Sequence, residues 1–177
     1  MTGPHPRSVE PYLRERLAGG PIHFTLIDPD KSPGPVAAGV AAAAVGAGSH
    51  AILLGGSTGI SPAGMGAAAA AVKGAVRVPV VIFPEGPGSL AREADAVLFM
   101  SLLNSRRLDL LIRAHAAAAP AIRRLGLEPI PLGYLVIAPG MRVGEVGEVD
   151  AVPRDDPATA VGYALAAEYL GMRFVYL

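Results

Sequence analysis

The sequence predicts an α/β fold in which a parallel β-sheet is covered by α-helices. Short aliphatic and β-branched runs alternate with longer Ala-rich runs along the 177 residues, which is the pattern of successive strand–helix units. The strand-type runs are apolar throughout, as is typical of strands buried on both faces. The length suits a single domain over residues 1–177, since one hydrophobic core stops growing only near about 250–300 residues.

In the first half of the chain, turn residues separate the expected elements. An amphipathic helix at 8–17 stops at Gly19-Gly20-Pro21, and Asp28-Pro29-Asp30 with Pro33-Gly34 separates the first strand from the next helix, because Gly and Pro favour turns. The expected elements are, in order, helix 8–17, strand 23–27, helix 35–47, strand 51–54, helix 62–76, strand 78–83 and a single helical turn at 89–93.

The second half continues the same alternation with one long interruption. We expect strand 96–100, a loop at 101–105, helix 108–125 and strand 130–138, followed by a Gly-containing loop to Pro153. Asp156 is a good N-cap with Pro157 at the first helical position, and this helix ends at Gly171. The last expected strand is 173–177.

Two architectures fit this order: an open doubly wound sheet and a (β/α)8 TIM barrel. Six units complete the former and leave the latter incomplete. The chain stops in the apolar run Phe174-Val175-Tyr176-Leu177, whereas termini are usually exposed and polar. A barrel typically needs about 250 residues. We therefore expect a TIM barrel with about six β/α units present and its last quarter missing.

Composition excludes several classes of function. Fifteen basic and fifteen acidic residues cancel, which argues against nucleic-acid binding. The absence of cysteine excludes disulfides and thiolate metal sites. The most apolar stretch, 36–54, is rich in Ala and Gly and interrupted by polar residues, unlike a membrane span. The charged N-terminal region does not resemble a signal peptide, so we expect a cytoplasmic protein.

Candidate site residues follow the expected strands, where ligands bind in either architecture. Asp28 and Asp30 could hold a hard cation such as Mg²⁺, although the same residues also favour a plain turn. The backbone of Gly55-Gly56-Ser57 could approach an anion at the start of a helix, although such turns also occur without a ligand.

For the other polar residues, a structural role is an alternative to ligand binding. Asn104, with Arg106 and Arg107 behind it, could bind phosphate or simply cap a helix. His23, His50 and His115 are expected to be packed or rim residues rather than metal ligands. The sequence leaves two interpretations of Glu168 open: an exposed acid on a helix, or a residue that points to the site.

Several segments together resemble the geranylgeranylglyceryl phosphate synthase family of TIM-barrel prenyltransferases. They are HFTLIDPDK (23–31), LGGSTGI (54–60), ADAVLFMSLLNS (94–105), EPIPLGYLVIAPG (128–140) and ALAAEYLGMRFVYL (164–177). The resemblance implies transfer of a geranylgeranyl or similar prenyl group from a prenyl diphosphate to sn-glycerol 1-phosphate, which forms an ether-lipid precursor.

The resemblance also implies roles for individual residues. Asp28 and Ser57 would ligate Mg²⁺, and Tyr134 would face the reacting carbon. Tyr176 and Leu177 would begin the segment that binds glycerol phosphate. Together with Gly55, Gly56 and Asn104, which were named above from their positions after strands, they make up the expected substrate-binding residues.

Two departures from the family pattern limit what the resemblance implies. The family continues after Tyr-Leu with Glu-Ala-Gly-Ser-Gly, which is missing here, and Glu145 stands where an aromatic residue is expected. We therefore expect this chain to be inactive alone. The alternatives are another TIM-barrel enzyme with a phosphorylated substrate, or an inactive fragment that depends on a partner. A full-length protein is expected to form a homo-oligomer and to have peripheral membrane contact.

Overall fold

The computed structural model describes residues 8–56 and 60–177 and divides the chain into two compact units. The first unit comprises Met1–Leu98 and Pro120–Pro129, and the second comprises Phe99–Ala119 and Ile130–Leu177. The strands follow one another in the sheet in chain order, from β1 to β6. This order, with helices between the strands, confirms the predicted α/β class and the six β/α units of an incomplete barrel.

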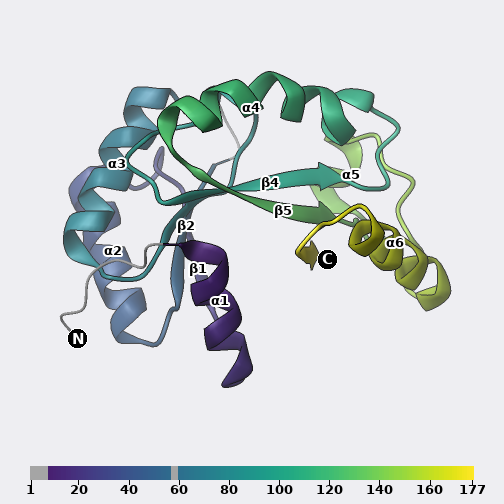
Figure 1. The fold of residues 1–177 in the computed structure, drawn as a ribbon, viewed down its shortest axis with the longest axis horizontal. Coiled ribbons are helices and arrows are strands. Elements are labelled where there is room, and N and C mark those ends of the chain that lie inside the picture. Colours follow the sequence, from purple (N-terminus) through teal and green to yellow (C-terminus); the bar gives the residue numbers. More distant parts are fainter. Residues whose placement is uncertain (1–7, 57–59) are drawn as a thin grey trace. The chain divides into compact units, whose positions relative to one another are not determined.

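The first unit contains parallel strands with helices between them (Figure 1). Residue pairs such as Leu26 with Leu53 and Leu53 with Val81 set the parallel register. Helices α2 and α3 pack on each other and on these strands. Its elements are α1 (Val9–Ala18), β1 (Phe24–Ile27), α2 (Gly34–Gly46), β2 (Ala51–Leu54), α3 (Pro62–Ala75), β3 (Val80–Ile82), the 3₁₀ turn η1 (Pro87–Ser89) and the start of β4 (Ala96–Leu102).

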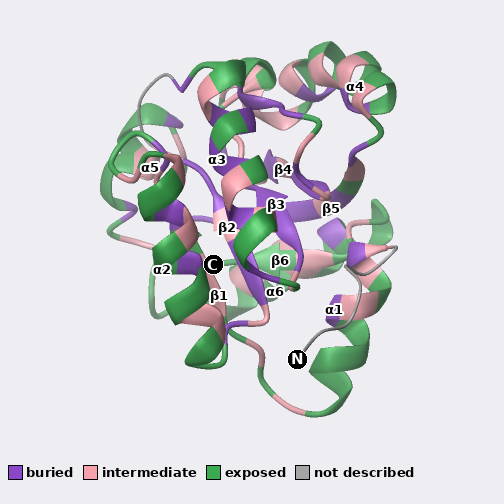
Figure 2. Cartoon of the chain, turned by 90° about the vertical axis from the view of Figure 1, so that its left-hand side faces the viewer, coloured by how far each residue is buried: buried purple, intermediate pink, exposed green. Residues whose placement is uncertain are grey.

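The core of the first unit lies between its strands and its Ala-rich helices. Ala37 and Ala41 of α2, and Ala69 of α3, are completely buried, because small side chains let a helix approach its neighbours closely. Figure 2 shows the buried strands against helices whose outer faces are exposed. The fully buried large side chains of this unit include Ile52, Leu54, Met65, Val72, Val80 and Ile82.

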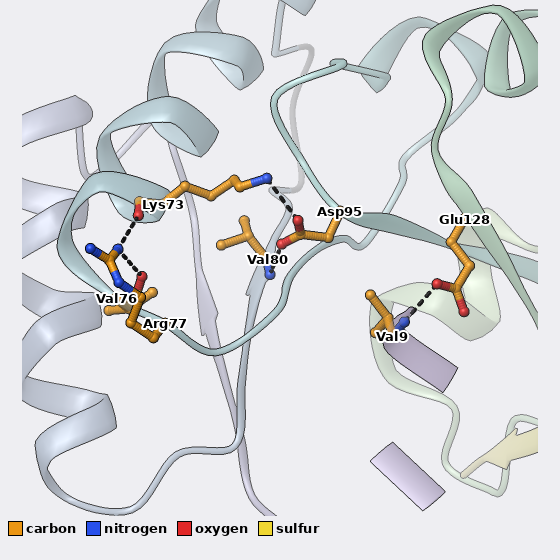
Figure 3. Close-up of polar contacts among 7 residues, drawn as sticks. All are labelled: Val9, Lys73, Val76, Arg77, Val80, Asp95 and Glu128. Carbon is orange, nitrogen blue, oxygen red and sulfur yellow. Dashed lines mark hydrogen bonds and ion pairs between the residues drawn. The ribbon is translucent and has the colours of Figure 1, made fainter. Parts of the chain in front are cut away.

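Two carboxylates hold the ends of elements in the first unit (Figure 3). Asp95 accepts hydrogen bonds from the Lys73 ammonium at 2.7 Å and from the Val80 N–H at 2.8 Å. Glu128 accepts hydrogen bonds from the N–H group of Val9 at 2.6 Å and from that of Glu10 at 2.8 Å. These bonds fasten α3 to the start of β4, and the N-terminus of α1 to the start of β5.

The second unit contains the end of β4, the later strands and three helical segments. Strand β5 pairs in parallel with β6, with Leu132 opposite Phe174 and Tyr134 opposite Tyr176. Its elements include η2, a π-helical segment (Asp109–Arg113), the start of α4 (Ala114–Leu125), most of β5 (Glu128–Tyr134), α5 (Met141–Val146), α6 (Pro157–Tyr169) and β6 (Phe174–Tyr176).

Several local predictions differ from the structure, including the three that follow. Strand β5 ends at Tyr134 rather than at residue 138. The predicted loop up to Pro153 contains α5, a six-residue helix. The helical turn expected at 89–93 lies at Pro87–Ser89, where proline sets the required φ angle. Among the described residues, no helix combines the length and apolar character that crossing a membrane requires.

Candidate functional site

Asp28 follows the last residue of β1 and sits in a turn that holds both of its carboxylate oxygens. Oδ1 accepts a hydrogen bond from the Asp30 N–H at 3.1 Å, and Oδ2 lies 3.0 Å from the Lys31 ammonium. The Asp28 carbonyl accepts bonds from the N–H groups of Lys31 and Ser32. The predicted turn is therefore present, and it presents an anionic side chain that is one-fifth exposed. The hydrogen bond from Lys31 holds the pKa of Asp28 below its usual range.

The two glycines after β2 leave space for neighbouring atoms that a Cβ would meet. A Cβ at Gly55 would overlap the Phe83 carbonyl oxygen, and a Cβ at Gly56 would lie 2.7 Å from Asp28 Oδ1. The backbone at Gly56 therefore forms a cradle that the Asp28 carboxylate occupies. Ser57, predicted as a metal ligand, lies outside the described residues.

The donors at this point suit a magnesium ion held mainly by its substrate. Mg²⁺ takes oxygen ligands and is commonly bound by one or two carboxylates together with substrate phosphates and water. Asp28 supplies one fixed carboxylate oxygen at Oδ1 and a second at Oδ2 that is shared with an exposed lysine. Within residues 8–56 and 60–177, no three His, Asp or Glu side chains gather into a metal site. These residues fit a metal that depends on phosphate oxygens for the rest of its coordination.

In the second unit, Tyr134 and Tyr176 lie side by side at the carboxyl ends of β5 and β6. Their ring centroids are 4.7 Å apart and their planes are inclined by 56°. A Cβ at Gly133 would lie 3.2 Å from the Cβ of Ala167 in α6, so the side chain of the neighbouring Tyr134 points to the opposite face of the sheet. Burial raises the pKa of Tyr134, with a smaller contribution from Tyr176, which keeps the phenol neutral. Leu177 follows and is 71% exposed.

Asn104 has a structural role in the second unit. Its amide nitrogen donates to the carbonyls of Val136 at 2.9 Å and Asp150 at 2.8 Å, and its carbonyl oxygen accepts from the Val136 N–H at 3.1 Å. The side chain is 97% buried. Both amide N–H groups are therefore taken by the main chain, so Asn104 clamps three segments together, and a substrate contact by its side chain stays a prediction.

The two arginines behind Asn104 also hold the chain together. Arg107 pairs with Asp109 at 2.7 Å and donates to the Val146 carbonyl at 3.0 Å. Arg106 donates to the Glu148 carbonyl at 3.3 Å. Their bonds join the start of the long helix to the segment that contains α5, so the predicted phosphate contact has no support from this geometry.

His23, His50 and His115 lie apart from the candidate site residues of their own units. His23 and His50 lie at the amino ends of β1 and β2, where His23 Nδ1 is 3.0 Å from Ser49 Oγ. His115 is buried, with Nε2 3.3 Å from Ser101 Oγ and its ring 4.5 Å from that of Phe99. These positions agree with the packed or rim residues expected. Glu168 is exposed.

Lys31 also belongs to this site, although the sequence alone gave it no role. Its spacing of three residues from Asp28 was the available signal, since oppositely charged side chains at this spacing can meet within a turn. The ion pair is seen only once the turn is placed.

The chain is similar to known proteins over most of its length. The PcrB family model matches residues 12–177. The chain is 45% identical over 169 residues to geranylgeranylglyceryl phosphate synthase of Methanothermobacter marburgensis, covering 96% of this chain and 69% of that one. It is 43% identical over 169 residues to the synthase of Thermococcus kodakarensis, covering 96% and 67%.

Solved structures give the same result. The structure resembles (S)-3-O-geranylgeranylglyceryl phosphate synthase from Thermoplasma acidophilum, determined in complex with sn-glycerol-1-phosphate, with a TM-score of 0.88, 43% identity and coverage of 95% of this chain and 68% of that one. The wild-type enzyme from Thermoplasma volcanium matches with a TM-score of 0.82, 41% identity and coverage of 88% and 62%. The chain thus spans about two thirds of the length of these proteins.

Proposed function

The chain belongs to the PcrB family, and from this membership we propose that it transfers a prenyl group from a prenyl diphosphate to sn-glycerol 1-phosphate. The observation that carries the proposal is the 43–45% identity to synthases of this activity over 96% of the chain. In the reaction, the bond between the prenyl carbon and the diphosphate oxygen breaks. A bond from that carbon to the glycerol phosphate hydroxyl oxygen forms, and the hydroxyl proton is released.

Asp28 would hold Mg²⁺ together with Ser57, and the diphosphate would complete the coordination. When bound, the metal would stabilise the negative charge of the leaving diphosphate. The fixed Oδ1 and the cradle at Gly56 support this assignment, because a carboxylate held in place binds a cation without having to be ordered first.

Tyr134 would place its ring face beside the allylic carbon that loses the diphosphate. An aromatic face attracts a cation, and the neutral state of this buried phenol leaves that face intact. Tyr176, in contact with Tyr134, and Leu177 would begin the segment that receives glycerol phosphate. Gly55 and Gly56 would contribute to the diphosphate site by leaving room for Phe83 and for the Asp28 carboxylate.

We also propose that these 177 residues bind prenyl diphosphate but do not turn it over alone. About a third of the length of the relatives has no counterpart in them. We place the enzyme in the cytoplasm, in peripheral contact with the membrane that receives its lipid product. A longer form would associate with copies of itself, and the exposed stripe Val161, Leu165 and Tyr169 on α6 supports this.

The test uses a non-hydrolysable geranylgeranyl diphosphate analogue and the 177-residue chain. Saturable binding that requires Mg²⁺ is expected, and a chain that instead binds only water-soluble sugar phosphates points to a different phosphate-dependent enzyme. A chimera that continues from Leu177 into the remaining third of the Methanothermobacter marburgensis relative is expected to form the ether product, detected by mass spectrometry of the organic extract. A folded chimera that binds both substrates and forms no ether contradicts the proposed activity.

A further inference from the structure

The ion pair between Lys31 and Asp28 suggests a role for Lys31 that rests on the proposed function. Asp28 is the described carboxylate assigned to the metal, yet its Oδ2 already lies 3.0 Å from the Lys31 ammonium. A divalent cation that approaches Asp28 therefore meets a positive charge at the same oxygen. Lys31 has either to leave Oδ2 or to raise the energy of the bound metal.

The two oxygens of Asp28 are held in different ways. Oδ1 accepts a main-chain N–H from Asp30 and lies against the backbone of Gly56, so moving it requires a change in the turn. Oδ2 is held by a side chain that is 78% exposed. Exposed ion pairs contribute little to stability, and the lysine ammonium sits on a flexible four-carbon stem. Lys31 can therefore leave Oδ2 without a change in the fold.

We propose that Lys31 is a positioning residue that changes partner during the binding of substrate. While the site holds no metal, its ammonium neutralises Asp28 and keeps the carboxylate in the turn. When metal and a diphosphate bind, Oδ2 turns to the metal and the ammonium pairs with the diphosphate oxygens. Lys31 then opposes the binding of metal alone and favours the binding of metal with diphosphate.

This exchange predicts effects of opposite sign for one substitution. Lys31→Gln removes the charge and keeps a side chain of similar length. It is expected to bind Mn²⁺ alone about five-fold more tightly than the unmodified chain, because like charges no longer meet at Asp28. The same variant is expected to bind inorganic pyrophosphate, in the presence of Mg²⁺, about five-fold more weakly.

Both affinities can be measured on the 177-residue chain without any turnover. Electron paramagnetic resonance of free Mn²⁺ gives the affinity for metal alone, and calorimetry gives the affinity for pyrophosphate at saturating Mg²⁺. Arg14→Gln is the matched control, since it removes one positive charge from another exposed ion pair, with Glu10 at 2.9 Å. Lys31→Arg retains the charge and is expected to restore pyrophosphate binding.

The outcomes separate this inference from the proposed function. Opposite shifts in Lys31→Gln, with neither shift in Arg14→Gln, support the exchange of partners. A chain that binds Mn²⁺ and pyrophosphate, and in which Lys31→Gln behaves like Arg14→Gln, overturns the role of Lys31 and leaves the proposed function standing. Weakening of both affinities overturns the exchange, because Lys31 then only shapes the turn. Failure of the unmodified chain to bind pyrophosphate in the presence of saturating Mg²⁺ overturns both proposals.

Discussion

Asp28 in the first unit and Asn104 in the second both follow a strand, yet the structure treats them in opposite ways. Asp28 is partly exposed, and among the described residues one of its oxygens is held by an exposed lysine. Asn104 is buried, and both of its N–H groups are bonded to main-chain carbonyls. A polar residue at the end of a strand is thus available to a ligand only when its hydrogen-bonding capacity is not already used within the fold.

The largest expected effect comes from Asn104→Ala. The substitution leaves the N–H and carbonyl of Val136 without their partner, and a buried polar group without a partner costs about 1–3 kcal/mol. We expect a loss of about 3–5 kcal/mol in the free energy of unfolding, measured by urea denaturation. Asn104→Asp, which keeps the volume and loses both donors, is expected to lose at least as much. If Asn104→Ala leaves the free energy of unfolding unchanged and abolishes pyrophosphate binding, then Asn104 is a ligand-binding residue and not a structural one.

Asp28→Asn is expected to do the opposite. The free energy of unfolding should change by less than about 1 kcal/mol, because the ion pair with Lys31 is exposed. Pyrophosphate binding in the presence of Mg²⁺ should weaken at least about ten-fold, because an amide is a poorer ligand for a hard cation than a carboxylate. Asp156→Asn is the control, since it removes the same charge at a helix N-cap where Asn serves as well as Asp. Equal losses of affinity in both variants would contradict the assignment of Asp28.

His115 extends the comparison to a buried group that titrates. Burial lowers its pKa from the ordinary value of 6.5, so below that pH the unfolded chain binds the proton more readily than the folded chain. Its contribution to stability is therefore fully present above about pH 6.5 and is lost as the pH falls toward the folded-state pKa.

The measurement is urea denaturation between pH 8 and pH 5 for the unmodified chain and for His115→Gln. The difference between the two stabilities should shrink with falling pH by up to about 1.4 kcal/mol per pH unit. Taking the difference removes the contribution of the other histidines. A difference that does not vary with pH would mean that His115 does not titrate differently in the folded chain.

The smallest expected effect comes from Gly56→Ala. Its new methyl group would lie 2.7 Å from Asp28 Oδ1, so the carboxylate has to shift, and we expect about three-fold weaker binding of Mn²⁺. Gly39→Ala is the control, because no atom lies within 4 Å of its added Cβ. That control should leave Mn²⁺ affinity unchanged and raise stability by about 0.5–1 kcal/mol, as expected for Ala in a helix. Unchanged Mn²⁺ affinity in Gly56→Ala would mean that the cradle does not position Asp28.

Local patterns predicted most of the elements. Strand β2 has the expected bounds, and Asp156 caps α6 by accepting a hydrogen bond from the Thr159 N–H at 3.1 Å. Helix α5 was missed because its six residues are too few to show a helical periodicity in the sequence. It also begins at Met141, whose φ of 45° is unusual for a residue other than glycine. The helix predicted at 108–125 opens with a π-helical segment, in which the Leu111 carbonyl accepts a hydrogen bond from Ser101 Oγ.

The candidate site was predictable where its contacts are close in sequence. Asp28, its turn and its glycine neighbours were all named from the sequence, since each follows the end of a strand. The role of Asn104 was not, because its partners are Val136 and Asp150, 32 and 46 residues away. Spacing along the chain cannot show which polar side chains will be hydrogen-bonded to main-chain groups so far away in sequence.

The carboxylate of Glu128 also determines when, during folding, the N-terminus of α1 gains its hydrogen-bond acceptor. Ser8 makes no side-chain cap for this ten-residue helix, and so short a helix is marginal in water by itself. Its first N–H groups are bonded to a residue that lies 119 positions later in the chain. During synthesis α1 therefore emerges before β5, and until β5 has formed α1 is exposed to proteases. Its amide hydrogens should exchange with solvent until that strand has joined the sheet.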